Sequence, residues 1–250
     1  MNKIIVTLAV STFIHLNAIA AAAPPAAAPP AAAPPVAANK ELTITPKVTL
    51  DSGYTTRANH LGLQIQKNSA FVSSSVSLEN SVVTPTISST YFVAGENKSQ
   101  IMLDASLAKG LTLGPVTAVS VVGIQKRFID GDFEDSFTAY GGLRLVKVPL
   151  LSAIATPYVS VARDFNYDLL GTTVGMDRTF TLGSVSLTPR AEAYLFDKHT
   201  AYTAGGNLAY NGFKYVKPYV DVAYVTSDTA LAARKFEGNL AATVGVKMSF

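Results

Sequence analysis

The chain has 250 residues, of which 48% are hydrophobic, no cysteine, and a formal net charge of +3. The absence of cysteine excludes a disulfide framework, thiolate metal sites and lipid attachment through an N-terminal cysteine. The charge is too small to indicate a nucleic-acid partner. An exported chain this apolar, without a helix-length apolar stretch, fits a membrane protein only if its apolar residues alternate along strands.

Residues 1–20 have the organisation of a secretory signal peptide. Lys3 gives a basic start, a mostly apolar stretch follows from Ile4 to Leu16, and small residues precede the expected cleavage after Ala20. The alternative, a membrane anchor, is disfavoured because polar residues interrupt a stretch already shorter than the ~20 residues of a spanning helix. Removal of Lys3 leaves 19 Lys and Arg against 17 Asp and Glu, a net charge of +2.

Residues 21–40 are rich in alanine and proline and begin with three copies of Ala-Ala-Ala-Pro-Pro. A proline pair every five residues removes backbone donors and clashes with each preceding helical turn. We therefore expect an extended, disordered linker of the polyproline type. It is interpreted either as a periplasmic spacer or as a disordered tail that leaves the following domain free during export.

From Glu41 onward, prolines divide the chain into segments of alternating polarity. Six of the seven remaining prolines stand at the start of such a segment: Pro46, Pro85, Pro115, Pro157, Pro189 and Pro218. Proline lacks the ladder donor and is tolerated mainly at the first residues of a strand. Each interval has room for two membrane strands of ~9–11 residues, which predicts six hairpins and twelve strands.

Counting in twos from each proline predicts which residues face an apolar medium. These include Val48, Leu50, Ile87, Val119, Val121, Val159, Val161, Ala191, Leu195, Val220 and Val222. Aromatic residues near the predicted strand ends would form two girdles. One girdle would hold Tyr54, Tyr91, Phe128, Phe137, Tyr194, Tyr202 and Tyr224, and the other Phe180, Tyr210 and Phe250.

Two places fit this pattern poorly. Residues 60–68 alternate on their own, either as a thirteenth strand or as the tall outer part of the second strand, and an even strand count favours the latter. Arg178 falls on the predicted lipid face, where a charge near mid-bilayer costs about 2–4 kcal/mol. A β-bulge that shifts its register would remove this conflict.

The last segment, Leu240–Phe250, alternates up to its final residue. Thr243, Gly245, Met248 and Phe250 fill the pattern polar-x-Gly-x-x-apolar-x-aromatic. This ending resembles the terminal strand of bacterial, porin-like outer-membrane β-barrel proteins, and the alternating pattern extends the resemblance over residues 41–250. The resemblance implies an all-β, up-and-down antiparallel transmembrane barrel of twelve strands in a Gram-negative outer membrane. It also implies outer-membrane lipid, lipopolysaccharide and the barrel-assembly machinery as partners.

The inward face of such a barrel is where function is expected. In the predicted register this face carries charged residues of both signs, our candidates for lining a pore: Lys47, Asp51, Asp104, Arg144, Arg190, Glu192, Asp221 and Lys247. Small inward residues predict free space, and hence passive diffusion of small hydrophilic solutes through a narrow mixed-charge lumen. Alternatively, opposite charges pair across the lumen and close it, leaving a non-conducting surface protein that acts as an adhesin, a structural element or a receptor.

The sequence gives little support for an enzymatic function, so no catalytic residue, metal or cofactor is expected. His60 and His199 lie in or near predicted loops, and neither has a serine partner at a fixed spacing. Loop histidines of this kind are expected to be solvated. Asp130, Asp132, Glu134 and Asp135 crowd one outer loop but do not match the spacing of an EF-hand. The sequence leaves open whether the barrel is a monomer or a trimer.

Overall fold

The computed structural model describes residues 44–60, 63–80, 82–93, 99–129, 135–149, 151–197, 199–228 and 239–250. The expected signal peptide (1–20) and Ala/Pro linker (21–40) lie outside the described residues. The elements are β1 (Thr45–His60), β2 (Leu63–Glu79), β3 (Thr84–Phe92), β4 (Gln100–Leu113), β5 (Val116–Ile129), β6 (Ser136–Lys147), the 3-10 helix η1 (Leu151–Ala153), β7 (Thr156–Asp164), β8 (Leu169–Asp177), β9 (Phe180–Leu182), β10 (Val185–Phe196), β11 (His199–Tyr210), β12 (Val216–Asp228) and β13 (Asn239–Ser249).

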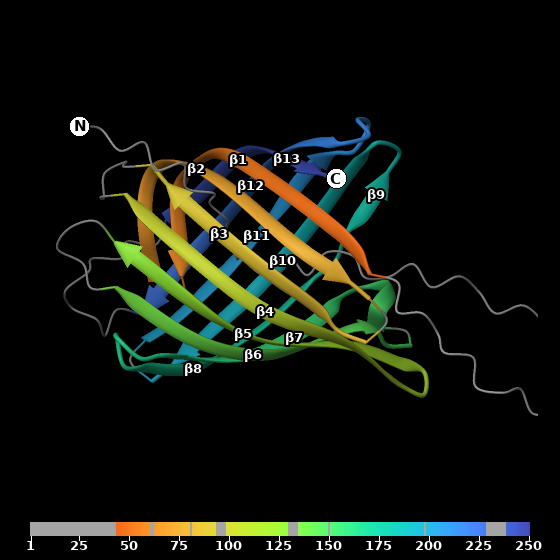
Figure 1. Cartoon of the computed structure of the whole chain (residues 1–250), viewed down its shortest axis with the longest axis horizontal. Helices are drawn as coiled ribbons and strands as arrows, with labels where there is room; N and C mark the ends of the chain where they lie inside the picture. The colour runs from red at the N-terminus through yellow and green to blue at the C-terminus, as the bar shows by residue number, and fades with distance from the viewer. Residues whose placement is uncertain are drawn as a thin grey trace, which may run out of the picture.

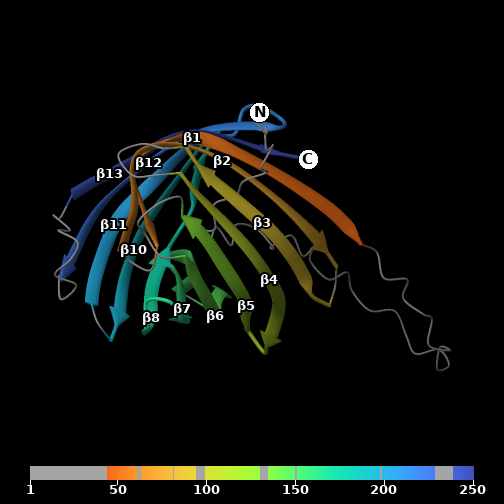
Figure 2. The same cartoon turned by 60° about the vertical axis from the view of Figure 1, so that its left-hand side comes forward.

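These strands form a single antiparallel sheet that closes into a barrel (Figure 1). Each strand pairs with its neighbours in sequence, and β1 pairs with β13 to complete the ring. β8 and β9 both pair with β10 and occupy one position in the ring, so the barrel has twelve strand positions. The predicted twelve-stranded, all-β, up-and-down antiparallel barrel is confirmed. Figure 2 shows β10–β13 on one side and β3–β5 on the other.

The two ends of the barrel differ in their connections. β1 begins and β13 finishes at the same end, where Gly114-Pro115 and Gly183-Ser184 form tight turns. The longest connection, between β12 and β13, lies at the opposite end. Outer-membrane barrels have their longer loops on the extracellular side, so we call the end with the termini periplasmic and the opposite end outer. Gly114 and Gly183 have φ of 59°, a left-handed conformation that glycine adopts without steric cost.

Alternation along the strands gives the barrel an apolar outer face. Ile87, Leu240 and Val244 are among the most exposed large apolar residues, at 71%, 64% and 59%. Their strand neighbours Ser88 and Gly245 are buried on the inner face. Among the described residues, no helix has the length and apolar character needed to cross a membrane. A closed barrel with an apolar outer belt is built for a lipid bilayer, in bacteria the outer membrane.

The predicted outward positions hold in most strands, but Val119 and Val121 were assigned to the wrong face. Both are buried on the inner face of β5, opposite Gly110 and Ala108 of β4, and Val122 is the exposed residue. Two causes combine. Pro115 lies in the turn before the strand, and apolar residues occupy both faces of 118–122.

The two poorly fitting segments have different outcomes. Residues 63–68 form the outer part of β2, as preferred, and His60 ends β1. Arg178 does lie on the outer face, but the expected bulge is wrong. The β10 partners on either side, Asp177↔Arg190 and Phe180↔Leu187, keep one continuous register. The strand is interrupted because Arg178 lies opposite Pro189, which has no amide hydrogen to donate; the Arg178 amide still donates to the Pro189 carbonyl at 3.2 Å.

The aromatic girdles need one correction. Tyr54, Tyr202 and Tyr224 are exposed at the outer end, and Phe180, Tyr210 and Phe250 are exposed at the periplasmic end. Tyr194 is not a girdle residue, since it is buried on the inner face of β10.

Candidate pore

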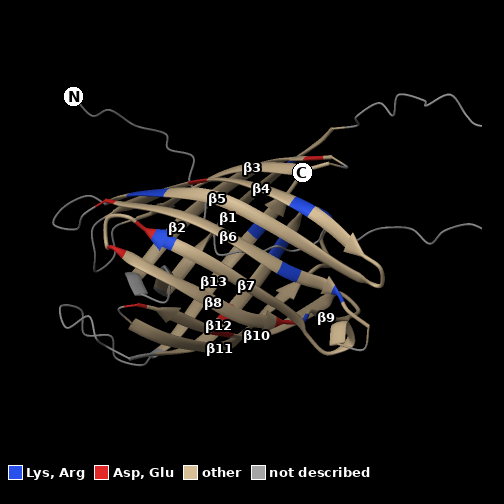
Figure 3. Ribbon diagram, turned by 90° about the horizontal axis from the view of Figure 1, so that it is seen from below, with Lys and Arg blue, Asp and Glu red and all other residues tan. Residues whose placement is uncertain are grey.

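All eight residues proposed to line a pore lie on the inner face of the barrel, although they come from six different strands. Their cross-strand partners fix this orientation: Asp51 lies opposite Lys247, and Arg144 lies opposite Tyr158. Figure 3 marks the positions of Lys, Arg, Asp and Glu along the ribbon of the strands. The inner face also carries other ionisable residues, including Glu79, Arg127, Asp164, Asp177, His199 and Lys217.

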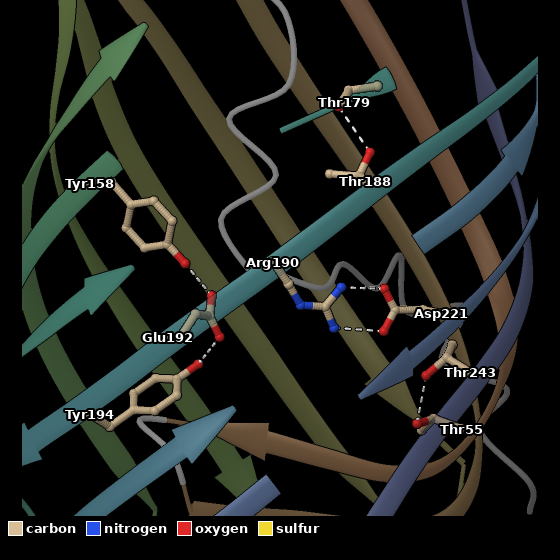
Figure 4. Close-up of polar contacts among 9 residues, drawn as sticks. All are labelled: Thr55, Tyr158, Thr179, Thr188, Arg190, Glu192, Tyr194, Asp221 and Thr243. Atoms are coloured by element: carbon tan, nitrogen blue, oxygen red, sulfur yellow. Dashed lines mark hydrogen bonds and ion pairs between the residues drawn. The ribbon is translucent and has the colours of Figure 1, made fainter. Parts of the chain in front are cut away.

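Arg190 and Asp221 form the most complete ion pair of the inner face. The guanidinium of Arg190 on β10 donates to both carboxylate oxygens of Asp221 on β12, at 2.5 and 2.6 Å (Figure 4). The pair reaches over β11, where Gly205 lies opposite Arg190 and presents no side chain. Two parallel charge-assisted bonds fix both side chains along the wall.

A second network connects β6, β7, β8 and β10. Arg144 forms an ion pair with Asp177 and lies 5.4 Å from the ring centroid of Tyr158. The Tyr158 hydroxyl donates to Glu192, whose other oxygen accepts a bond from Tyr194 at 2.6 Å (Figure 4). The carboxylate of Glu192 is therefore held between two tyrosine hydroxyls.

Tyrosine hydroxyls also bond two further carboxylates of the inner face. Tyr140 on β6 donates to Asp104 on β4 at 2.7 Å, and Ser88 on β3 lies 3.5 Å from the same carboxylate. Tyr219 on β12 lies 3.1 and 3.3 Å from the two oxygens of Asp51 on β1. At the periplasmic rim, Lys47 pairs with Glu79 on the neighbouring strand at 3.2 Å.

The aromatic rings of the inner face lie over glycines of the adjacent strand. Directly opposed pairs are Phe71–Gly53, Tyr140–Gly123, Tyr158–Gly175, Phe196–Gly171 and Tyr219–Gly245. A Cβ added at Gly123 or Gly175 would lie 2.5 Å from the tyrosine ring, closer than any real contact. The glycines thus allow the rings to lie flat against the wall instead of projecting into the lumen.

Each polar bridge runs along the wall. Arg190–Asp221, Tyr140–Asp104 and Tyr219–Asp51 each cross one intervening strand, and Lys47–Glu79 joins adjacent strands. The sequence could not reveal these partners, because they lie 31 to 168 positions apart. The available signal was the recurrence of glycine and tyrosine at inward positions of neighbouring strands.

The inner face is packed more tightly in the outer half than in the periplasmic half. Two apolar clusters occupy the outer half: Phe71, Phe92 and Met102 on β2–β4, and Ala162, Leu169, Tyr194, Phe196 and Ala201 on β7–β11. Thr90, near the first cluster, is fully buried. In the periplasmic half, Gly110 and Thr112 are exposed and Ser75, Ser77 and Thr86 are half-buried. We therefore expect the lumen to be wider on the periplasmic side, although Val119 and Val121 of β5 are buried there.

Two lysines face each other in this wider half. Lys217 on β12 lies opposite Lys247 on β13, and Lys247 lies opposite Asp51 on β1. No hydrogen bond or ion pair of either ammonium group is found among the described side chains. Like charges opposed across strands destabilise the sheet. The two lysines therefore give this part of the described inner face a local excess of positive charge.

The histidine expectation was wrong for His199. It is buried at the outer end of the lumen and stacks on Phe196, with ring centroids 5.1 Å apart. The side chain of His60 lies outside the described residues, as do Asp130, Asp132 and Glu134. Asp135 forms an ion pair with Lys126 at 3.4 Å. Within the described part of the chain, no group of three or more His, Asp or Glu could hold a metal ion.

The four residues of the terminal pattern lie at the closing seam between β12, β13 and β1. The Thr243 hydroxyl lies 2.9 Å from that of Thr55 (Figure 4), and Gly245 lies beneath Tyr219. Met248 faces outward opposite Leu50. Phe250 stacks on Tyr215 with centroids 6.0 Å apart, and its amide donates to the carbonyl of Val48 at 2.9 Å.

Comparisons with known proteins find likeness in structure and not in sequence. No protein-family model matches the chain, and no curated protein sequence matches it. A solved structure of the KdgM porin in complex with disordered oligogalacturonate is similar over 82% of this chain and 99% of that chain, with a TM-score of 0.54 and 15% identity. A second KdgM porin structure covers 81% of this chain and 99% of its own, with a TM-score of 0.54 and 14% identity.

Proposed function

We propose that this barrel, which has the fold of a bacterial outer-membrane porin, is a channel for the passive diffusion of small hydrophilic solutes. The observation that carries the proposal is the placement of large inner side chains against the wall. Five aromatic rings lie over glycines, and the charged residues that bond a side chain find it no further than the second strand. With this packing, these side chains do not form bridges across the lumen.

The character of the inner face favours polar solutes of low charge. Ion pairs offset the charges of Glu79, Asp177 and Asp221, whereas Asp51, Asp104 and Glu192 accept bonds from neutral tyrosine hydroxyls, so the described wall carries charges of both signs. Opposite this charged wall, β2 and β3 present hydroxyl groups, including Ser73, Ser75, Ser77, Thr86, Ser88 and Thr90. Hydroxyls and paired charges offer both donors and acceptors to a hydrated solute.

The first experiment is single-channel conductance of the refolded mature protein in a planar bilayer. Discrete current steps support the channel. Silence from a protein whose folded state is verified by heat-modifiable migration on a gel would contradict it and favour the non-conducting surface protein.

Cysteine substitution tests the current path, because the chain contains no other thiol. Thr86 and Ser89 are half-buried residues of β3 that face the lumen and the bilayer, respectively. A bulky methanethiosulfonate reagent should reduce the current through Thr86→Cys and leave the current through Ser89→Cys unchanged. Equal responses from both variants would place the current outside the lumen.

Further hypotheses from the sequence stand as predictions. Residues 1–20 direct export, residues 21–40 form an extended linker, and the terminal pattern is read by the barrel-assembly machinery. Lipopolysaccharide would contact the outer end of the belt. The oligomeric state is measurable by native mass spectrometry.

A further inference from the structure

Arg178 is a basic residue on the bilayer-facing surface whose guanidinium finds no partner in the described protein. It belongs to the outer face because the ladder with β10 keeps its register on both sides, with Thr179 turned inward to bond Thr188 (Figure 4). Its Nε is buried and has no hydrogen-bond acceptor. A buried donor without an acceptor costs about 1–3 kcal/mol, so the protein leaves this guanidinium in an unfavourable state. Its terminal nitrogens are not among the buried unpaired atoms and are the ones that an anionic ligand could reach.

The outer face itself offers no counter-charge. Four basic residues lie on it, Lys109, Lys126, Arg163 and Arg178, and no Asp or Glu of the strands with a described side chain does. The two cations at the outer end have loop carboxylates as partners, Lys126 with Asp135 and Arg163 with Asp168. A second copy packed through the same described strand face would meet Arg178 with cations only.

The depth of Arg178 corresponds to the periplasmic leaflet. It lies two positions from Phe180, an exposed residue of the periplasmic girdle, and four from Leu182, where the strand ends. Lys109 lies equally four positions from Leu113, the end of β4, and is exposed. A long basic side chain one step inside a girdle extends its charge toward the lipid headgroups.

Beside Arg178 the outer face is shallow. Pro189 lies opposite it on β10, followed by Gly206 on β11, and the next outward pair is Ala191 with Ala204. Leu187 and Leu208 border this patch on the periplasmic side. Small side chains between larger ones leave room for one acyl chain next to the guanidinium.

We propose that Arg178 binds the phosphate of an anionic glycerophospholipid of the periplasmic leaflet, with one acyl chain over the Pro189, Ala191, Ala204 and Gly206 patch. Phosphate oxygens accept the guanidinium donors that the protein leaves unused. The lipid site goes beyond the proposed channel and does not depend on conduction.

The test is native mass spectrometry of the folded protein in detergent, titrated with dioleoyl phosphatidylglycerol or with dioleoyl phosphatidylcholine. The wild type is expected to retain phosphatidylglycerol several-fold better, Arg178→Lys to keep part of this preference, and Arg178→Gln to lose most of it. Arg163→Gln, at the outer end, is the matched control and should behave as the wild type.

Three results would overturn the proposal. Equal retention of the two lipids by the wild type would remove the site, and an unchanged preference in Arg178→Gln would place it elsewhere. An oligomer that disappears in Arg178→Gln would make the residue a protein contact. Heat-modifiable migration verifies that each variant is folded, and unchanged conductance of Arg178→Gln separates this outcome from failure of the channel.

Discussion

The outer and periplasmic halves of the lumen are built on the same strands but packed differently. The outer half buries apolar side chains such as Met102 and Leu169 against the wall, whereas the periplasmic half exposes Gly110 and the ion pair of Lys47 with Glu79. We therefore expect the outer half to hold the smallest cross-section and the periplasmic half, which we call the vestibule, to set the charge preference. Size exclusion and charge preference would be controlled by different residues.

The largest loss of stability is expected when a glycine that lies beneath an aromatic ring is replaced by alanine. Gly175→Ala places a Cβ 2.5 Å from the Tyr158 ring, which must leave the wall and lose its bond to Glu192. Overpacking of this kind costs about 2–3 kcal/mol. Urea unfolding of the refolded protein in lipid vesicles measures the loss. Gly110→Ala, which has open space for its Cβ, should be neutral, and equal losses from both variants would show that glycine itself matters rather than the ring.

Removing one partner of the bidentate pair should be the next largest effect. Asp221→Asn leaves Arg190, a partly buried cation, without its carboxylate, and hydrogen bonds to charged groups contribute about 1.5–3 kcal/mol. We expect a loss near 2 kcal/mol in the same unfolding assay. The double variant Arg190→Gln with Asp221→Asn should recover part of it, and additive losses would mean that the two side chains act independently.

Thiol reactivity sharpens the contrast between the halves. Thr86 and Thr90 both face the lumen from β3, but Thr90 is fully buried. With a methanethiosulfonate added from the periplasmic side, Thr90→Cys should react more than about tenfold slower than Thr86→Cys, because a buried group reacts only after local opening. Similar rates would remove the constriction from the outer half.

The smallest effect is expected from the vestibule lysines. Replacing Lys217 and Lys247 by Gln should lower the permeability of anions relative to cations, measured as a shift of the reversal potential in a KCl gradient. The shift should grow as salt is lowered, since the screening length is about 10 Å at 0.1 M and lengthens with dilution. Lys214→Gln is the control, because Lys214 lies over the Tyr215 ring in a turn. An equal shift in the control would show a nonspecific surface charge.

The sequence was sufficient for the architecture because each strand carries its own two-residue period. Prolines and turn glycines set the number of hairpins, and the outward positions followed from exposed residues such as Ile87 and Leu240. Alternation gave the wrong face for Val119 and Val121, since both faces of that segment are apolar and the polarity difference between them is lost. Arg178 was placed on the correct face, but the sequence could not show that Pro189 lies opposite it and interrupts the ladder without a bulge.

Alternation predicted which residues face inward, but it could not predict which side chains they bond. All eight candidates were assigned inward from alternation alone, yet their bonds depend on which strand lies two places away and at what height. Tyr219 reaches Asp51 only because β12, β13 and β1 meet at the seam with Gly245 between them. Register between distant strands is a property of the whole closed sheet, and no local pattern encodes it.

The closing seam constrains the order in which this molecule acquires its structure. Thr55 and Thr243, bonded across it, are 188 positions apart, whereas every other ladder joins strands that follow one another in sequence or, for β8 and β10, have only the short β9 between them. Hairpins can therefore form locally and early, but the ring cannot be completed until β13 has arrived. Until then both β1 and β13 have an unpaired edge, the feature that promotes aggregation of β-proteins. Biogenesis of this barrel therefore requires that these two edges be protected until the ring closes.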